Sequence, residues 1–175
     1  MTRIQSLRLR DFVVTENSNE ARELYTVSRF GVLLPDGRVQ LSFFEALYLL
    51  EKGKIQVLDG HKKPISAEKL MRFCSRLDKR FWVRYAVFKN IRNRGYIIKT
   101  ALKFGADFRV YARGKMPGEA HAKWVVFPVH EAEALTWQDF AAKNRVAHST
   151  KKNLLIAVVD DESDVSYWEV CWVRP

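Results

Sequence analysis

The chain has 175 residues, of which 47% are hydrophobic and 13% aromatic, so it can bury about 70% of its unfolded surface. This composition excludes a chain that is disordered throughout. Its 30 Lys and Arg residues outnumber its 20 Asp and Glu residues and give a net charge of +10. A charge of this size favours a polyanionic partner, such as nucleic acid or an acidic membrane face. A basic surface without any such partner is the alternative.

The positive charge is concentrated in one segment. Between Lys89 and Lys115, eight Lys and Arg residues stand against Asp107 alone. We therefore expect this segment to form the electrostatic footprint for the partner.

The sequence carries no motif for a metal, a cofactor or a membrane. Cys74 and Cys171 lie outside any CxxC or Cys/His cluster of metal-ligand spacing, which indicates core thiols in a reducing compartment. The segment MTRIQSLRLRDF lacks the apolar region of a secretory signal, and the longest aliphatic run, Leu154 to Val159, is too short to cross a bilayer. We expect a cytoplasmic protein with no cofactor and no membrane partner.

Residues 1–80 predict a small N-terminal α+β domain. Residues 5–14 have the composition of a strand, and Asn17 or Ser18 can cap a helix that runs to Val27. The turn Pro35-Asp36-Gly37 indicates a hairpin over 31–41. The other expected elements are a helix that opens with the capping-box pair Ser42 and Glu45 and ends at Gly53, a strand from Ile55 to Leu58, and a helix opened by Ser66.

Residues 81–175 mix helices and strands in an α/β or α+β pattern. Apolar residues at helical spacing predict a helix from Phe81 to Asn93, which Gly95 ends. The elements expected after it are strands over 96–99, 107–112 and 122–129, a helix opened by Thr136 and Asp139 that runs towards Lys152, and a terminal hairpin of strands 154–159 and 165–173 around an acidic turn.

Three residues of this second half combine the groups that cleave RNA without a metal: a phenol, an imidazole and an ammonium. Tyr111 lies in an alternating strand, on the face opposite Val110, and His121 follows a loop at the entry to the next strand. Lys151 and Lys152 are expected at a helix end, where they project about 100° apart. Each residue taken alone also fits a structural role: a half-buried strand tyrosine, a solvated histidine, or a cation at a helix C-terminus.

The chain resembles the archaeal tRNA-splicing endonuclease family over its whole length. Two residues differ from the usual family pattern: Lys151 stands where the family usually has Arg, and Ala101 where it usually has Gly. The motifs that carry the resemblance are Arg94-Gly95-Tyr96, Lys103-Phe104-Gly105-Ala106-Asp107-Phe108 up to Val110-Tyr111, Glu119-Ala120-His121-Ala122, Arg145-Val146-Ala147-His148-Ser149 leading to Lys152, and Val158-Val159-Asp160 with a terminal Trp.

The resemblance implies an α+β fold in which residues 1–80 precede a catalytic α/β domain, residues 81–175, with a central mixed sheet flanked by helices. It implies a metal-independent endoribonuclease that excises introns from precursor tRNA at bulge-helix-bulge sites. The catalytic triad falls on Tyr111 as base, His121 as acid and Lys152 as the cation for the phosphorane. The expected products carry a 2′,3′-cyclic phosphate and a 5′-hydroxyl.

Further roles follow from the same resemblance. Arg145 and Trp172 match positions that hold an extruded bulge base between them, although Trp172 also fits a core position on the last strand. Trp168 is a weaker candidate for the stacking residue, and His148 for a group that assists at the phosphate. The acidic turn with Asp160, Asp161 and Asp164 implies a subunit contact that holds a homotetramer, whereas for an arbitrary protein it would be a solvated hairpin tip.

Two other functions are considered. A metal-dependent nuclease would need clustered carboxylates, yet no Asp or Glu lies two residues before a lysine and Asp107 has no acidic partner nearby in the sequence. A non-catalytic RNA-binding subunit of the same fold would have no need of Tyr111, His121 and Lys152 together.

Overall fold

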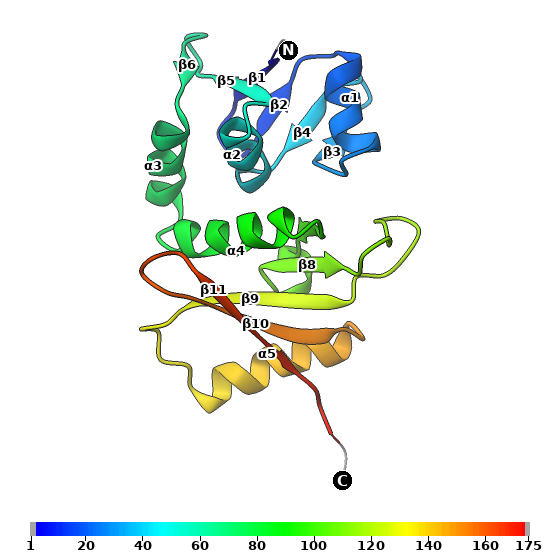
Figure 1. Cartoon of the computed structure of the whole chain (residues 1–175), viewed down its shortest axis with the longest axis vertical. Helices are drawn as coiled ribbons and strands as arrows, with labels where there is room; N and C mark the ends of the chain where they lie inside the picture. The colour runs from blue at the N-terminus through cyan, green and yellow to red at the C-terminus, as the bar shows by residue number, and fades with distance from the viewer. Residues whose placement is uncertain (1–2, 174–175) are drawn as a thin grey trace. The chain divides into compact units, whose positions relative to one another are not determined.

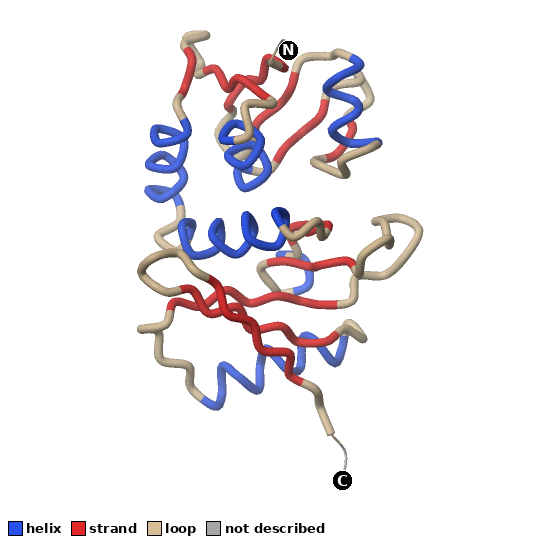
Figure 2. Tube along the Cα trace, viewed as in Figure 1, coloured by secondary structure: helices blue, strands red, loops and turns tan. Residues whose placement is uncertain are grey.

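The computed structural model describes residues 3–173. Within this range it contains five α-helices and eleven strands in two sheets, and the predicted α+β class is confirmed. The chain divides into two compact units, the first ending at Phe81 and the second beginning at Trp82. Figure 2 shows the helices and strands that make up each unit.

The first unit is built on a six-stranded sheet with the order β3-β4-β2-β1-β5-β6. Its only parallel pair among the described residues is β1 with β5. The elements are β1 (Ile4–Arg8), β2 (Val13–Thr15), α1 (Asn19–Thr26), β3 (Val32–Leu33), β4 (Val39–Leu41), α2 (Phe43–Glu51), β5 (Ile55–Leu58), β6 (Pro64–Ile65) and α3 (Ala67–Leu77).

Local signals set most of these boundaries. Ser18, rather than Asn17, caps α1, and the predicted hairpin forms as β3 and β4 around Gly37, whose φ of 82° requires glycine. The Ser42 hydroxyl accepts from Glu45 N at 3.3 Å while the Glu45 carboxylate accepts from Ser42 N at 3.0 Å, so the capping box of α2 is complete.

The prediction of one strand over residues 5–14 is wrong. Leu9 N donates to Phe12 O at 2.8 Å, which turns the chain back so that β2 pairs antiparallel with β1. The turn contains neither glycine nor proline, and therefore the sequence carried no strong break at this point.

The second unit is a five-stranded mixed sheet with the order β11-β10-β9-β8-β7. Its strands β9 and β10 are parallel, and the other neighbouring pairs are antiparallel. The elements are α4 (Phe81–Asn93), which starts at the unit boundary, β7 (Ile97–Thr100), the 3₁₀ turn η1 (Leu102–Phe104), β8 (Phe108–Tyr111), β9 (Trp124–His130), α5 (Trp137–Ser149), β10 (Asn153–Val159) and β11 (Val165–Val170).

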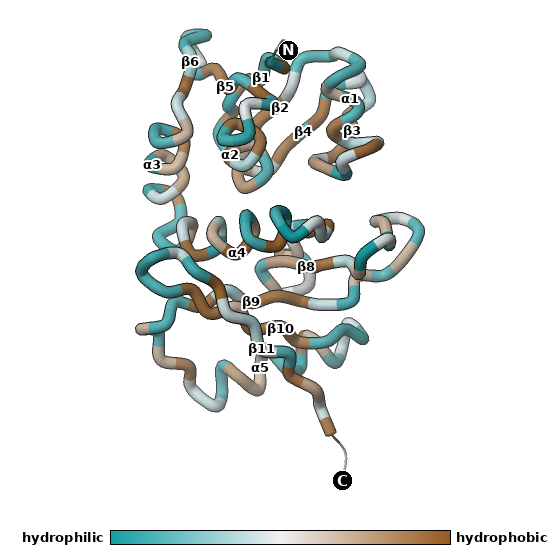
Figure 3. Tube along the Cα trace, in the orientation of Figure 1, coloured by the Kyte–Doolittle hydropathy of each residue, from teal (hydrophilic) through white to brown (hydrophobic). Residues whose placement is uncertain are grey.

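Helices cover both faces of this sheet (Figure 1). Helix α5 packs on β9 and β10, and α4 lies on the opposite face, where the rings of Phe88 and Phe108 are 6.0 Å apart. Because both faces are covered, the five consecutive residues 125–129 of β9 are buried, and the middle of this strand is brown in Figure 3.

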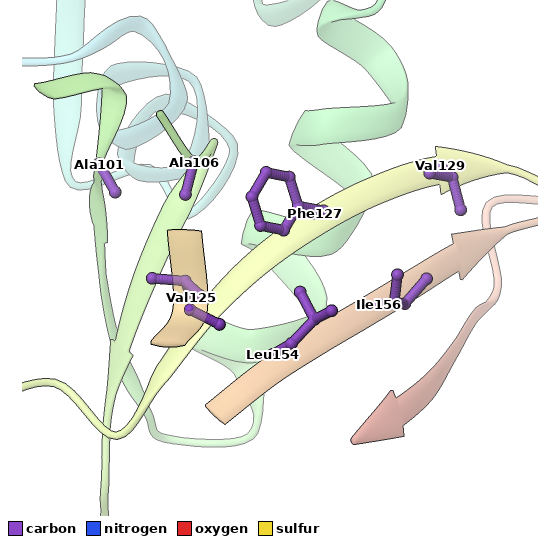
Figure 4. Packing of buried hydrophobic residues seen from close by; sticks show 8 residues of the cluster. Ala101, Ala106, Val125, Phe127, Val129, Leu154 and Ile156 are labelled. Atoms are coloured by element: carbon purple, nitrogen blue, oxygen red, sulfur yellow. The ribbon is translucent and has the colours of Figure 1, made fainter. Parts of the chain in front are cut away.

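A cluster of buried hydrophobic residues lies between α5 and the strands β9 and β10. Val125, Phe127 and Leu154 come from β9 and β10, and Figure 4 shows them gathered with small residues of the β7–β8 connection. Ala147 of α5 is buried in the same cluster. The connection itself ends η1 at Gly105, whose φ of 74° favours glycine.

Two predicted ends in this unit are wrong. Helix α5 stops at Ser149, and Lys151 has a φ of 53°, so neither Lys151 nor Lys152 lies in the helix. Strand β11 ends at Val170 rather than 173, because its partner β10 begins at Asn153 and the last pair is Leu154 with Val170.

Candidate active site

The three strand ends that carry Tyr111, His121 and Lys152 meet at one edge of the second sheet. Tyr111 is the last residue of β8, His121 lies three residues before β9, and Lys152 directly precedes β10. Because β8 is antiparallel to β9 and β9 is parallel to β10, the end of β8 lies beside the starts of the other two strands.

The backbone of Lys123 links these strand ends. Lys123 N donates to Val110 O at 2.9 Å, and Lys123 O accepts from Asn153 N at 3.0 Å. Since neighbouring strands lie about 4.8 Å apart, the backbones at Tyr111 and Lys152 are about two strand spacings, roughly 10 Å, apart. Side chains as long as tyrosine and lysine can reach one group between them from the two sides.

The three side chains differ in exposure. Tyr111 is 3% exposed, with the Arg109 guanidinium 5.9 Å from its ring centroid, so the phenol is more deeply buried than the half-buried strand tyrosine weighed from sequence. His121 is exposed in the loop between β8 and β9. Lys152 is half-buried, and its Nζ donates to Thr150 O at 2.8 Å. A fixed phenol, an accessible imidazole and an ammonium can serve as base, acid and charge-stabilising group.

A second group of predicted residues lines a hollow of about 550 Å³ between α5 and the segment after β11. Arg145, His148 and Trp172 all border it, and the rings of His148 and Trp172 meet edge to face at 5.4 Å. Trp172 is 67% exposed and lies beyond the strand, which contradicts a core role. Trp168 lies on β11 and is 56% exposed, but it does not line this hollow.

The last turn of α5 connects this hollow to the strand-end row, by which we mean the adjacent ends of β8, β9 and β10 with Tyr111, His121 and Lys152. Lys152 N donates to Ala147 O at 2.9 Å, and Lys151 N donates to His148 O at 3.0 Å. The backbone of Lys152 is therefore fixed to the same turn that presents Arg145 and His148.

The acidic turn joins β10 to β11, and hydrogen bonds define its shape. Asp160 Oδ1 accepts from Glu162 N at 3.0 Å and from Asp164 N at 2.8 Å. Asp161, with its side chain 86% exposed, contacts His130 Nε2 at 3.0 Å. Asp160 thus holds the turn together, while the side chains of Asp161 and Asp164 are exposed.

Sequence reasoning missed a set of aromatic rings beside the basic segment. Tyr96, Trp124 and Tyr167 each lie under a cation, from Arg113, Lys123 and Arg94 respectively. The charge count between Lys89 and Lys115 pointed to Arg94 and Arg113, but not to the rings they cover.

Asp107, the one carboxylate in the basic segment, forms an ion pair with Arg84 at 2.8 Å. Residues 3–173 contain no group of three His, Cys, Asp or Glu side chains that could hold a metal ion. Within the same range, no helix combines the length and the hydropathy needed to span a bilayer.

Comparison with known proteins covers both units. The family description "tRNA intron endonuclease, N-terminal domain" matches residues 5–71, and "tRNA intron endonuclease, catalytic C-terminal domain" matches residues 81–167.

Proteins named tRNA-splicing endonuclease align with 78% to 96% of the chain. The one from Thermococcus kodakarensis is 42% identical over 164 residues, 94% of this chain and 95% of its own. The one from Methanothermobacter thermautotrophicus is 41% identical over 170 residues, 96% and 97% of the two chains. The one from Nanoarchaeum equitans is 44% identical over 142 residues, 78% and 90%. The chain belongs to the tRNA intron endonuclease family.

Proposed function

We propose that this protein is a metal-independent endoribonuclease that excises introns from precursor tRNA at bulge-helix-bulge sites. The observation that carries the proposal is the meeting of the ends of β8, β9 and β10: Tyr111 ends β8, His121 lies three residues before β9, and Lys152 directly precedes β10. Family membership supports the substrate, since the relatives are named for tRNA splicing.

The proposed reaction is an internal transesterification. Tyr111 takes the proton of the ribose 2′-hydroxyl, and the 2′-oxygen forms a bond to the adjacent phosphorus. The bond from phosphorus to the 5′-oxygen breaks, and His121 gives a proton to that leaving oxygen. Lys152 stabilises the extra negative charge on the phosphorane. The products carry a 2′,3′-cyclic phosphate and a 5′-hydroxyl, and no oxidant or further reactant is required.

The size of the catalytic effect is consistent with these groups. A well-placed general acid or base contributes about 10²–10⁴-fold, and removing one electrostatic contact to a developing oxyanion costs about 10²–10³-fold. Because Tyr111 is almost fully buried, its ring is held in one place before the substrate arrives, which reduces the reorganisation that the reaction needs.

The hollow beside α5 serves in this proposal as the site of an extruded bulge base. Arg145 offers a planar cation and Trp172 an exposed indole on the same hollow. Stacking on such groups stabilises binding by about 1–3 kcal/mol per base and does not depend on base identity.

Assembly completes the proposal. The exposed carboxylates of the acidic turn complement the net charge of +10 on each chain, so a second copy is a suitable partner for the turn. We infer a homotetramer, in which one chain type provides both the triad and the acidic turn.

The test uses the purified chain and a bulge-helix-bulge RNA. Cleavage is expected to continue in excess EDTA and to stop when the nucleotide 5′ of the scissile bond is 2′-deoxy, because the nucleophile is then missing. A 2′-deoxy substitution two nucleotides away is the matched control and is expected to be cleaved. Cleavage of the first deoxy substrate, or 3′-hydroxyl products, would overturn the mechanism. Absence of cleavage by the pure chain would favour the non-catalytic subunit.

A further inference from the structure

Three exposed cations and three half-buried aromatic rings form a continuous surface on the α4 side of the second sheet. We call it the cation–aromatic patch, and its members are Arg94, Tyr96, Arg113, Lys123, Trp124 and Tyr167.

The patch is organised by pairs. Lys123 Nζ lies 4.4 Å from the Trp124 ring centroid, Arg113 Cζ lies 5.0 Å from Tyr96, and Arg94 Cζ lies 5.6 Å from Tyr167. Contacts between the pairs connect them into one surface. The Tyr96 and Trp124 rings meet edge to face at 6.1 Å, and Arg113 Nη2 donates to Arg94 O at 3.2 Å.

The three cations carry uncompensated charge. Within residues 3–173, none of Arg94, Arg113 and Lys123 forms an ion pair with a carboxylate. Glu169 borders the same surface, but its carboxylate accepts a hydrogen bond from Asn153 Nδ2. Cation–aromatic contacts at exposed sites are weak. The hydrogen bonds from Arg94 Nε to Asn90 Oδ1 at 2.9 Å and from Arg113 Nη2 to Arg94 O at 3.2 Å have neutral acceptors, so none of these contacts compensates the charge.

The chemistry of the patch favours phosphate over a nucleobase. One face of each ring is occupied by a cation in the structure, so the groups that the patch presents to a ligand are cations. The hollow between the rings measures only about 160 Å³. Tyr167 is fixed beneath Arg94 because its hydroxyl donates to Asn90 Oδ1 at 3.0 Å, and burial raises the pKa of this phenol above its usual value, which keeps it uncharged.

The patch lies at the same sheet edge as the triad. Arg113 follows Tyr111 by two residues, and Lys123 follows His121 by two. Trp124 starts β9 opposite Val110. The hollow of the patch is bordered by Ile91 of α4, whereas Arg145 and Trp172 lie on the α5 side.

We propose that the cation–aromatic patch binds the phosphodiester backbone of the RNA strand that flanks the cleaved bond. This inference rests on the proposed function, since it takes the RNA to be the substrate cut at the strand-end row. Bound in this way, the RNA contacts both faces of the sheet at the end that carries the triad. Its backbone lies on the α4 side and its extruded base on the α5 side.

The experiment measures binding separately from cleavage. The probe is a bulge-helix-bulge RNA with 2′-deoxy at the scissile position, and its dissociation constant is determined as a function of salt concentration. Each phosphate contact adds about 0.7–0.9 to the steepness of the logarithmic salt dependence. The double variant Arg113→Gln with Lys123→Gln is therefore expected to bind more weakly and to lower the slope by about 1.4–1.8.

Two controls separate charge at this site from charge in general. The charge-keeping double variant Arg113→Lys with Lys123→Arg is expected to retain the slope of the parent. Lys52→Gln removes a cation that lies 5.4 Å from the ring of Tyr48 in the first unit, and it is expected to leave the slope unchanged. Thermal unfolding of every variant is measured alongside, and the exposed substitutions are expected to leave Tm unchanged.

The outcomes distinguish this inference from the proposed function. An unchanged slope in the Gln double variant, or an equal decrease in Lys52→Gln, would refute the patch while cleavage by the parent still supports the endonuclease. A lower slope in a protein that fails to cleave the all-ribose RNA would support the patch and refute the endonuclease.

Discussion

Replacing Tyr111 with Phe separates catalysis from folding, because the substitution removes one oxygen and leaves the buried ring. Tyr111 is 3% exposed, and the Arg109 guanidinium 5.9 Å from the ring centroid can keep its place over a phenylalanine. The free energy of unfolding is expected to change by no more than the net value of one hydrogen bond, about 0.5–1.5 kcal/mol.

The effect on cleavage is expected to be much larger. If the phenol is the general base, its loss lowers the rate by about 10²–10⁴-fold, which corresponds to roughly 2.7–5.5 kcal/mol of transition-state stabilisation. The expected loss in the barrier therefore exceeds the expected loss in stability.

Single-turnover cleavage at saturating enzyme measures this rate, and thermal unfolding measures the stability of the same preparation. Tyr85→Phe is the matched control, because Tyr85 is also 3% exposed and lies on α4 in the same unit. It is expected to cleave at the parent rate. A Tyr111→Phe protein that is folded and cleaves within tenfold of the parent would remove Tyr111 from the mechanism.

Two further predictions concern assembly and packing. The double variant Asp161→Lys with Asp164→Lys is expected to halve the native mass from four copies to two, because it reverses the exposed charges of the acidic turn. Asp160 is left in place because its Oδ1 accepts the hydrogen bonds that shape the turn. An unchanged mass would contradict the tetramer, and charge reversal at the exposed Glu20 and Glu23 of α1 is the control. Leu154→Ala is expected to reduce stability by about 2–5 kcal/mol and to lower Tm by roughly 4–20 °C, because Leu154 is 1% exposed in the core under α5. Leu102→Ala, at a side chain that is 68% exposed, should leave Tm nearly unchanged, and equal losses at both positions would refute this account of the core.

The elements that the sequence predicted well are those defined by neighbours in the chain. The pairs Ser42 with Glu45 and Thr136 with Asp139 form capping boxes, and in the second pair the Thr136 hydroxyl holds the pKa of Asp139 below its usual value. Helix α4 begins and ends where its apolar spacing indicated. Such signals act over three or four residues and need no knowledge of the rest of the fold.

Several of the errors occur where pairing between strands decides the outcome. Residues 165–173 are apolar or aromatic except for Ser166 and Glu169, yet the strand ends where β10 offers no further partner. The strand β6 (Pro64–Ile65) was not predicted, since two residues carry no period and only pairing with β5 defines them. Parallel pairing of β9 and β10 likewise has no local signature.

The same distinction applies to the candidate site. Motifs identified Tyr111, His121 and Lys152 as candidates, but whether the three residues lie close together in space depends on the order of the strands. The rings of Tyr96, Trp124 and Tyr167 come from three different strands or strand starts, so no local pattern indicates that three cations cover them.

Helix α5 connects the two halves of the proposed site. A parallel strand pair requires a crossover connection, and α5 provides the one between β9 and β10. Because Lys152 N is bonded to Ala147 O at the end of α5, and Asn153 N to Lys123 O at the start of β9, the position of the ammonium depends on both contacts. The helix that carries Arg145, the residue proposed to contact the bulge base, thus also fixes Lys152 beside the strand that follows His121. In the proposed mechanism, base binding and phosphate chemistry are therefore coupled through one helix, and a shift of α5 would disturb both together.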